Sequence, residues 1–308
     1  MQYRTNEYDV YHLIKFLWFK KYYVLTISFC ALVVSTIWSF SMPNEYKSEI
    51  TLAPTEGSHS SALSNMTAQF GGLASLAGIN IPNNSGDKVA LAIEYLQTRI
   101  FLTKFIKDNE IQVPLIAGKE WNSETHKLEI DPQIYDTENS KWVRLGRSGS
   151  ISPPSDLELF NRFTKLIEID RDKSNGIVTI SIQFLSPTLS EAWLRKLVSE
   201  LNMAMRSRDI QRLQQGITYL EGQITKTSNQ EMRQVFYRLI QEQSKQLMLA
   251  EISDDYIFDV LDPAYIPIEP SEPNRFLLVL FFVFLSTGMT LFGLILHFLI
   301  TPRKSQNK

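Results

Sequence analysis

Aspartates and histidines are the residue types in this sequence that could carry out hydrolysis or bind a metal. The aspartates crowd into one short stretch, and a pair of carboxylates at such spacing can act as acid and nucleophile on a glycosidic bond. They are Asp254, Asp255, Asp259 and Asp262. Helix ends and turns also collect aspartates, which is the simpler explanation of this group. The histidines, none of which has metal-ligand spacing to another, are His12, His59, His126 and His297.

Other motifs of catalysis and cofactor binding are missing from the sequence. Gly71 and Gly72 are not followed by the lysine and hydroxyl residue of a phosphate-binding loop, and no G-x-S-x-G stretch occurs. Cys30 is the single cysteine, which excludes a disulfide scaffold and a cysteine-based zinc site. The net charge of -2 gives no sign of a nucleic-acid partner. We therefore predict a protein that is not an enzyme, uses no cofactor or metal, and works through shape and partner contacts.

Two apolar blocks, one near each end of the chain, are long enough to cross a membrane. A spanning helix needs about 17–25 apolar residues, and both blocks fall in this range. We assign transmembrane helices to residues 24–42 and 276–300. A cleaved signal peptide would have a shorter apolar region that ends in small residues, whereas "WSFSMPNEY" follows here, so we predict a retained anchor.

Basic residues beside the two apolar blocks predict the orientation of the chain in the membrane. They are Arg4, Lys15, Lys20 and Lys21 before the first block, and Arg303, Lys304 and Lys308 after the second. Cytoplasmic flanks carry an excess of lysine and arginine, so a leader at 1–23 and a tail at 301–308 should both be cytoplasmic. Residues 43–274 should then form an exported domain, which in a bacterium is periplasmic. The sequence thus predicts a two-pass protein of the bacterial inner membrane.

The exported region predicts an α+β fold in which a small mixed α/β base carries a long protruding helical hairpin. We assign the base to residues 43–186 and 253–265. Its expected strands are residues 46–53, a β-hairpin of 167–170 and 177–184 around Asn175-Gly176, and a returning strand within 256–264.

The base should also contain two helices and two stretches without regular structure. Apolar positions at helical spacing predict one helix over 88–108 with Asp87 as its N-cap, and a short helix should follow Ser155 or Asp156. Residues 54–87 are rich in Ser, Asn and Gly and should be loop, and residues 113–154 should be irregular. The apolar island "QFGGLASLAGI" in the first loop either packs into the fold or meets a neighbour.

Residues 187–252 have a different pattern and predict the helical hairpin. The first helix should begin at Pro187, because proline suits a first helical position, and should reach Thr225. Ser228 and Glu231 fit a capping box that would start the second helix. Part of the first helix has the a/d spacing of a coiled-coil seam, which can be buried within one subunit or between neighbours. The seam residues are Ile210, Leu213, Ile217, Leu220 and Ile224.

A proline-rich stretch, "IPIEPSEPNRF", lies between the exported domain and the second apolar block. Proline fixes φ and pushes the residue before it toward extended geometry. Residues 266–275 should therefore form a semi-rigid extended strut next to the membrane. The candidate functional residues in and just before it are Pro263, Pro267, Pro270, Pro273 and Arg275.

Taken together, these features resemble the Wzz-type polysaccharide co-polymerases, the chain-length determinants of lipopolysaccharide O-antigen and related surface polymers. The resemblance covers nearly the whole chain. It is strongest over "LIQEQSKQLMLAEISDDYIFDVLDPAYIP", and "QFGGLASLAGI" and "EYDVYHLIKFLWFKKYYV" also fit.

Two stretches depart from the family pattern. Pro267 and Pro270 supply its P-x-x-P, but the serine-proline-lysine that follows in the family is replaced here by "SEPNR". Gly288 and Gly293 are one residue too far apart for the GxxxG pair of the second span, because five residues rotate about 140° around a helix.

The resemblance implies a non-enzymatic role. Such proteins form ring-like homo-oligomers in the inner membrane, act with a Wzy-type polymerase and set the modal length of a glycan built on a lipid carrier. The implied partners are therefore further copies of the chain, the polymerase, the growing lipid-linked glycan and the membrane, with no nucleic acid. The alternative class is a periplasmic adaptor of an envelope transport or secretion machine, but such adaptors usually lack a second span. A third class, an envelope glycosyltransferase or hydrolase, lacks a recognisable site.

Overall fold

The computed structural model describes residues 17–55, 88–146 and 149–300 of the 308-residue chain. The chain divides into two compact units. One unit combines both ends of the chain, Met1–Glu45 and Pro270–Lys308, and the other is the intervening Tyr46–Glu269. The apolar island and the predicted N-cap Asp87 lie outside the described residues.

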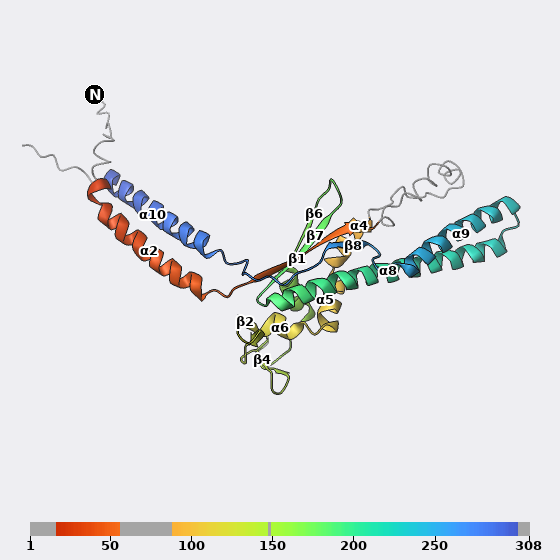
Figure 1. The fold of residues 1–308 in the computed structure, drawn as a ribbon, viewed down its shortest axis with the longest axis horizontal. Coiled ribbons are helices and arrows are strands. Elements are labelled where there is room, and N and C mark those ends of the chain that lie inside the picture. The colour runs from red at the N-terminus through yellow and green to blue at the C-terminus, as the bar shows by residue number, and fades with distance from the viewer. Residues whose placement is uncertain (1–16, 56–87, 147–148, 301–308) are drawn as a thin grey trace, which may run out of the picture. The chain divides into compact units, whose positions relative to one another are not determined.

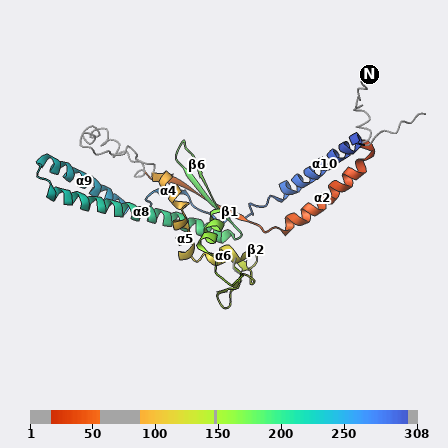
Figure 2. The same cartoon turned by 180° about the vertical axis from the view of Figure 1, so that it is seen from behind.

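Two long apolar helices form the first unit. They are α2 (Lys21–Ser41) and α10 (Arg275–Ile300), and they lie side by side (Figures 1 and 2). Lys21–Ser41 and Arg275–His297 are long and apolar enough to cross a membrane, with mean hydropathies of 1.9 and 2.3. The prediction of one candidate span near each end of the chain is confirmed.

A four-stranded antiparallel sheet organises the second unit. Its order is β6 (Ile167–Arg171), β7 (Val178–Phe184), β1 (Tyr46–Pro54) and β8 (Phe258–Asp262). Alternate side chains of the central strand β1 are buried, as the period of a strand with one covered face requires. The turn between β6 and β7 contains Gly176 at a φ of 75°, a backbone conformation that glycine adopts readily. All the predicted strands of the base are therefore present.

Helices cover one face of this sheet and enclose the core. The long helix α8 (Pro187–Lys226) packs against β1 and β7, and α4 (Lys88–Leu96), α5 (Arg99–Asp108) and α7 (Asp156–Thr164) complete the layer. Ser155 caps α7, as predicted, because its hydroxyl accepts the Glu158 N–H at 3.2 Å. The opposite face of the sheet is more exposed, and there Lys47 forms an ion pair with Glu168 at 3.0 Å.

The prediction of one helix over 88–108 is wrong, because the chain breaks between α4 and α5. Thr98 has an extended backbone at the break and caps α5, since its hydroxyl oxygen accepts the Phe101 N–H at 3.3 Å. The same hydroxyl donates to the Tyr95 carbonyl at 2.7 Å. The break rotates the following helix, so the apolar side chain of Ile100 is 76% exposed.

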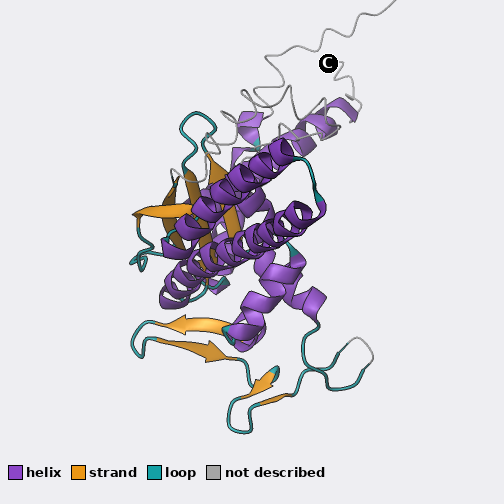
Figure 3. Cartoon of the chain, turned by 90° about the vertical axis from the view of Figure 1, so that its right-hand side faces the viewer, coloured by secondary structure: helices purple, strands orange, loops and turns teal. Residues whose placement is uncertain are grey.

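The prediction that residues 113–154 are irregular is also wrong. A short helix α6 (Gln112–Ala117) leads into the paired strands β2 (Gly118–Asn122) and β3 (Lys127–Ile130), which are followed by the small pair β4 (Tyr135–Asp136) and β5 (Lys141–Trp142). Figure 3 shows both pairs apart from the main sheet. Side chains that precede the turns stabilise them, since Asn122 accepts the Glu124 N–H at 3.0 Å and Asp136 accepts the Glu138 N–H at 3.0 Å.

The helical hairpin consists of α8 and α9 (Gln230–Ile252), which run side by side (Figures 1 and 2). At 40 residues, α8 is about 60 Å long at about 1.5 Å per residue. Asn229, and not Ser228, caps α9, because its side-chain oxygen accepts the N–H groups of Glu231 and Met232 at 2.8 and 3.3 Å. The first half of α8, through Met205, belongs to the core, and the half beyond it projects with α9.

Candidate functional site

The proline-rich segment is non-helical, as predicted, but it is not a free strut. The chain bends at Ile268 and Glu269 and then pairs with Glu45. The Ser271 N–H and hydroxyl donate to the Glu45 carbonyl at 2.8 and 3.0 Å, and the Glu45 N–H donates to the Glu272 carbonyl at 2.9 Å. We call Glu45, Ser271 and Glu272 the clasp. It joins the chain that leaves α2 to the chain that enters α10.

The predicted prolines have different surroundings. Pro263 and Pro270 are exposed, Pro273 is half-buried and Pro267 is buried. Because Pro267 is buried, the surrounding fold holds it in place. The exposed prolines restrict the chain through their fixed φ.

Arg275 is the first residue of α10 and contacts the end of α2. Its guanidinium donates to Asn44 Oδ1 at 2.8 Å and lies 4.6 Å from the centre of the Phe40 ring. Asn274 accepts the Leu277 N–H at 3.2 Å through its side chain and so caps α10. This cap marks the residue at which the second candidate span begins.

Polar and aromatic side chains join the two spans to each other. The hydroxyls of Ser28 and Thr287 are 2.7 Å apart, and the rings of Trp38 and Phe282 meet edge to face at 5.4 Å. Ser35 and Ser39 are buried, although most residues of α2 are not. Interfaces between membrane helices are enriched in such small and hydroxyl residues. This contact could not be identified from the sequence, because serines and threonines are too common in spans to stand out.

The predicted glycines of the second span, Gly288 and Gly293, do not contact the first span. A Cβ built on either glycine would meet nothing within 4 Å. Both are exposed on α10 and leave part of its surface open.

The predicted seam of α8 lies on the side that faces α9. Leu220 is 9% exposed, and Ile210, Leu213, Ile217 and Ile224 are half-buried. Gly216 lies on the same helical face as Leu213 and Leu220, and a Cβ on it would come within 2.6 Å of Gln243 Oε1 of α9. The glycine thus allows the two helices to approach closely, and the seam is partly covered within one chain.

A buried asparagine fixes the base of the hairpin to the sheet. Asn202 of α8 is 4% exposed and lies in an otherwise apolar stripe. Its side chain donates to the Phe258 carbonyl at 2.9 Å and accepts the N–H groups of Ile257 and Phe258 at 3.2 and 3.1 Å. These bonds hold the chain that returns from α9 to β8. A polar residue within an apolar helical stripe was the signal for this contact in the sequence.

A second polar group joins three elements at the same end of the hairpin. Lys88 Nζ of α4 lies 3.0 Å from Asp209 Oδ2 of α8 and 3.2 Å from the Tyr256 hydroxyl, which donates to that carboxylate at 2.6 Å. Burial raises the pKa of Tyr256, and the hydrogen bond to Asp209 and the negative charge of Asp209 raise it further.

We expect this group to make the protein less stable as the pH rises above about 10. Because the pKa of Tyr256 is higher in the folded chain than the usual value of about 10, the folded chain keeps a proton that the unfolded chain loses. The stabilisation is complete below about pH 10 and is lost as the pH rises above it. Melting temperatures measured from about pH 9 to about pH 11 should fall less steeply for Tyr256→Phe than for wild type. Tyr265→Phe, at an exposed tyrosine after β8, should keep the wild-type slope, and an equal slope for Tyr256→Phe would contradict the prediction.

The residues considered for catalysis do not assemble into a site in the part of the chain that is described. The four aspartates near the end of α9 and in β8 are exposed, and Asp254 lies 3.8 Å from Arg206. Within residues 17–55, 88–146 and 149–300, no three His, Cys, Asp or Glu side chains are placed to hold a metal ion. His12 and His59 lie outside these residues, and His126 occupies the β2–β3 turn at a φ of 50°.

The two units of the chain define a class of protein. In the sequence, an α+β domain with a helical hairpin lies between two helices that can each span a membrane. Residues 6–109 match the family model described as Wzz, chain length determinant protein, which confirms the resemblance predicted from the sequence. No curated protein matches the sequence.

Two solved structures are similar to the chain. A full-length bacterial polysaccharide co-polymerase is 12% identical, with 92% of this chain and 95% of that chain covered and a TM-score of 0.34. A fragment of WzzB, a polysaccharide co-polymerase from Salmonella Typhimurium, is 11% identical, with 74% and 100% covered and a TM-score of 0.31.

Proposed function

We propose that the protein is a non-enzymatic regulator of polysaccharide chain length in the bacterial inner membrane. The observation that carries the proposal is the match of residues 6–109 to the chain length determinant family. Two candidate spans, one near each end of the described chain, agree with it. Both termini are cytoplasmic in this proposal, because lysines and arginines lie before the first span and after the second. Tyr46–Glu269 is then periplasmic.

The protein acts in this proposal as a homo-oligomer together with a Wzy-type polymerase. Support for self-association comes from apolar side chains that stay exposed on the hairpin, where water would otherwise contact them. They are Met203, Tyr219, Val235, Tyr237, Met248, Leu249 and Ile252. The partly covered seam of α8 adds to this surface, and the exposed surface of α10 at Gly288 and at Gly293 is available for contact with the polymerase.

Deletion of the gene tests the proposed function. We expect the length distribution of the surface polysaccharide, resolved on a gel, to lose its preferred length. Expression of the wild-type protein from a plasmid should restore it. An unchanged distribution in the deletion strain would exclude a role in length control.

The proline-rich segment provides a sharper prediction. Alanine at Pro267, Pro270 and Pro273 should leave the protein folded in the membrane but shift or broaden the polymer length, because the chain next to the clasp loses its restricted φ angles. Gel analysis of the polysaccharide and protein levels in the membrane measure the two effects. Alanine at Pro132, an exposed proline between β3 and β4, is the matched control. Normal lengths in the triple variant would reduce the segment to a linker.

A further inference from the structure

A cavity of about 840 Å³ lies between α7, α6 and the loop that precedes α7. Four side chains at its edge follow one another along α7 and its C-terminal end: Glu158, Asn161, Arg162 and Lys165. Their spacing of three and four residues places them on one face of the helix, over about 10 Å at about 1.5 Å per residue. Leu159 and Phe163 are buried on the other face, in the core. The polar face of α7 therefore forms one wall of the cavity.

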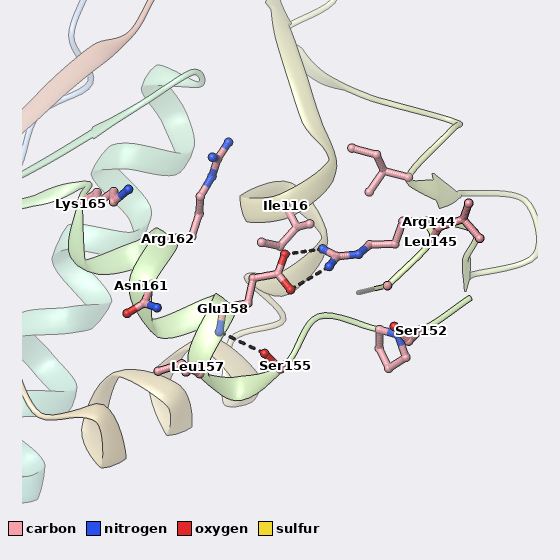
Figure 4. A pocket seen from close by; sticks show the side chains of 13 residues that line it. Ile116, Arg144, Leu145, Ser152, Ser155, Leu157, Glu158, Asn161, Arg162 and Lys165 are labelled. Carbon is pink, nitrogen blue, oxygen red and sulfur yellow. Dashed lines mark hydrogen bonds and ion pairs between the residues drawn. The ribbon is translucent and has the colours of Figure 1, made fainter. Parts of the chain in front are cut away.

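The cations that line the cavity differ in whether they form an ion pair. Arg144, from the preceding loop, binds Glu158 through two nitrogens at 2.6 and 2.7 Å, as Figure 4 shows. The side chains of Arg162 and Lys165 are exposed, and neither side chain forms a hydrogen bond or ion pair with another described residue. Among the described residues, the lining contains three cations and one carboxylate, an excess of positive charge in a protein whose net charge is negative.

The rest of the lining is made of short polar and aliphatic side chains. Ile116, Ile134, Leu145 and Leu157 contribute apolar surface, and Ser152 and Asn161 contribute a hydroxyl and an amide. The two bonds to Glu158 hold the Arg144 guanidinium in place before a ligand arrives, because a bidentate pair fixes orientation as well as position. A single small anion would occupy little of such a cavity, whose volume is that of a site for a much larger ligand.

We propose that this cavity binds an acidic saccharide, whose carboxylates pair with Arg162 and Lys165 while its hydroxyls and ring contact Asn161, Ser152 and the aliphatic wall. The charge excess selects an anion, the volume selects a ligand larger than a single small ion, and the mixed lining suits a sugar. The choice of a saccharide rests on the proposed function, in which the protein acts on a surface glycan.

Titration of the full-length, detergent-solubilised protein with a hexamer of galacturonic acid tests the proposal by calorimetry. The hexamer should bind, more weakly at higher salt, and its methyl ester, which is the same sugar without the charge, should not. The double variant Arg162→Gln/Lys165→Gln should bind about tenfold more weakly, because it loses two charge-assisted contacts. Arg212→Gln/Lys245→Gln, which removes two exposed cations from the hairpin, is the matched control and should bind like wild type. Melting temperatures of all variants check that the fold is intact.

Several results would overturn the proposal. These are equal binding of the hexamer and its methyl ester, wild-type binding by the Arg162/Lys165 variant, and no binding of the hexamer at all. Equal affinity for glycerol phosphate would assign the cavity to a phosphate or lipid headgroup instead. Failure of the proposed function is a separate result, because loss of length control is measured in the deletion strain. A strain with normal length control and a protein that does not bind the hexamer would exclude the acidic-saccharide site alone.

Discussion

The Trp193→Ala variant is expected to melt about 6–20 °C below wild type. The truncation of a buried tryptophan costs about 3–5 kcal/mol, and about 1 kcal/mol shifts the melting temperature of a domain of this size by about 2–4 °C. Trp193 is 4% exposed, and its ring centre lies 4.5 Å from that of Phe184 and 5.9 Å from that of Phe163. It thus joins α8 to β7 and α7, so its loss leaves a cavity where the hairpin helix meets the sheet.

Circular dichroism of the solubilised protein measures this effect, because the helical signal of the hairpin is strong. Tyr265→Ala is the matched control, since Tyr265 is an aromatic residue after β8 that is 53% exposed. We expect the control to change the free energy of unfolding by less than about 0.5 kcal/mol. Equal melting temperatures for the two variants would show that the aromatic contacts of Trp193 do not stabilise the fold.

The Asn202→Ala variant should lose about 3 kcal/mol of stability, or about 6–12 °C in melting temperature. The substitution removes three hydrogen bonds and leaves two N–H groups and one carbonyl of residues 257 and 258 without their side-chain partner. Buried groups that lose a partner cost about 1–3 kcal/mol each, and partial relaxation reduces the sum. The effect should therefore exceed that of an ordinary polar substitution.

Thermal unfolding of Asn202→Ala beside Gln214→Ala tests this prediction. Gln214 is an exposed amide of the same helix, so its replacement changes helix propensity but no buried bond. The two variants should differ by at least about 5 °C. A smaller difference would mean that water or a shift of the chain replaces the bonds that Asn202 makes.

Much of the fold could be predicted because the signals are local. Apolar length identifies the spans, alternation identifies β1 and β7, and Asn175-Gly176 marks the turn between β6 and β7. Two of the errors arose where one side chain decides between two local structures. Thr98 can sit inside a helix or cap one, and it caps α5 here. Ser228 and Asn229 are both good N-caps, and Asn229 occupies the position that reaches the first free N–H groups of α9.

The candidate sites were less predictable because distant residues form them. The clasp joins Glu45 to Ser271 and Glu272, and the cavity combines residues from 116 to 165 in several elements. No periodicity connects such residues in the sequence. The sequence alone assigns Pro267 and Arg275 to the proline-rich segment. Only the structure shows that Arg275 contacts Asn44 and Phe40.

The contact between Ser28 and Thr287 has a consequence for the synthesis of the protein. The two residues are 259 positions apart, so at about 5–20 residues per second the first span is made roughly 10 to 50 seconds before its partner. Two other hydroxyls of α2 have a partner within the helix from the start, because Thr26 donates to the Tyr22 carbonyl at 2.9 Å and Ser35 to the Leu32 carbonyl at 3.1 Å. Ser28 gains its partner only when the second span enters the bilayer. Pairing of the spans is therefore among the last steps in the biogenesis of the molecule, after the chain between them has left the ribosome.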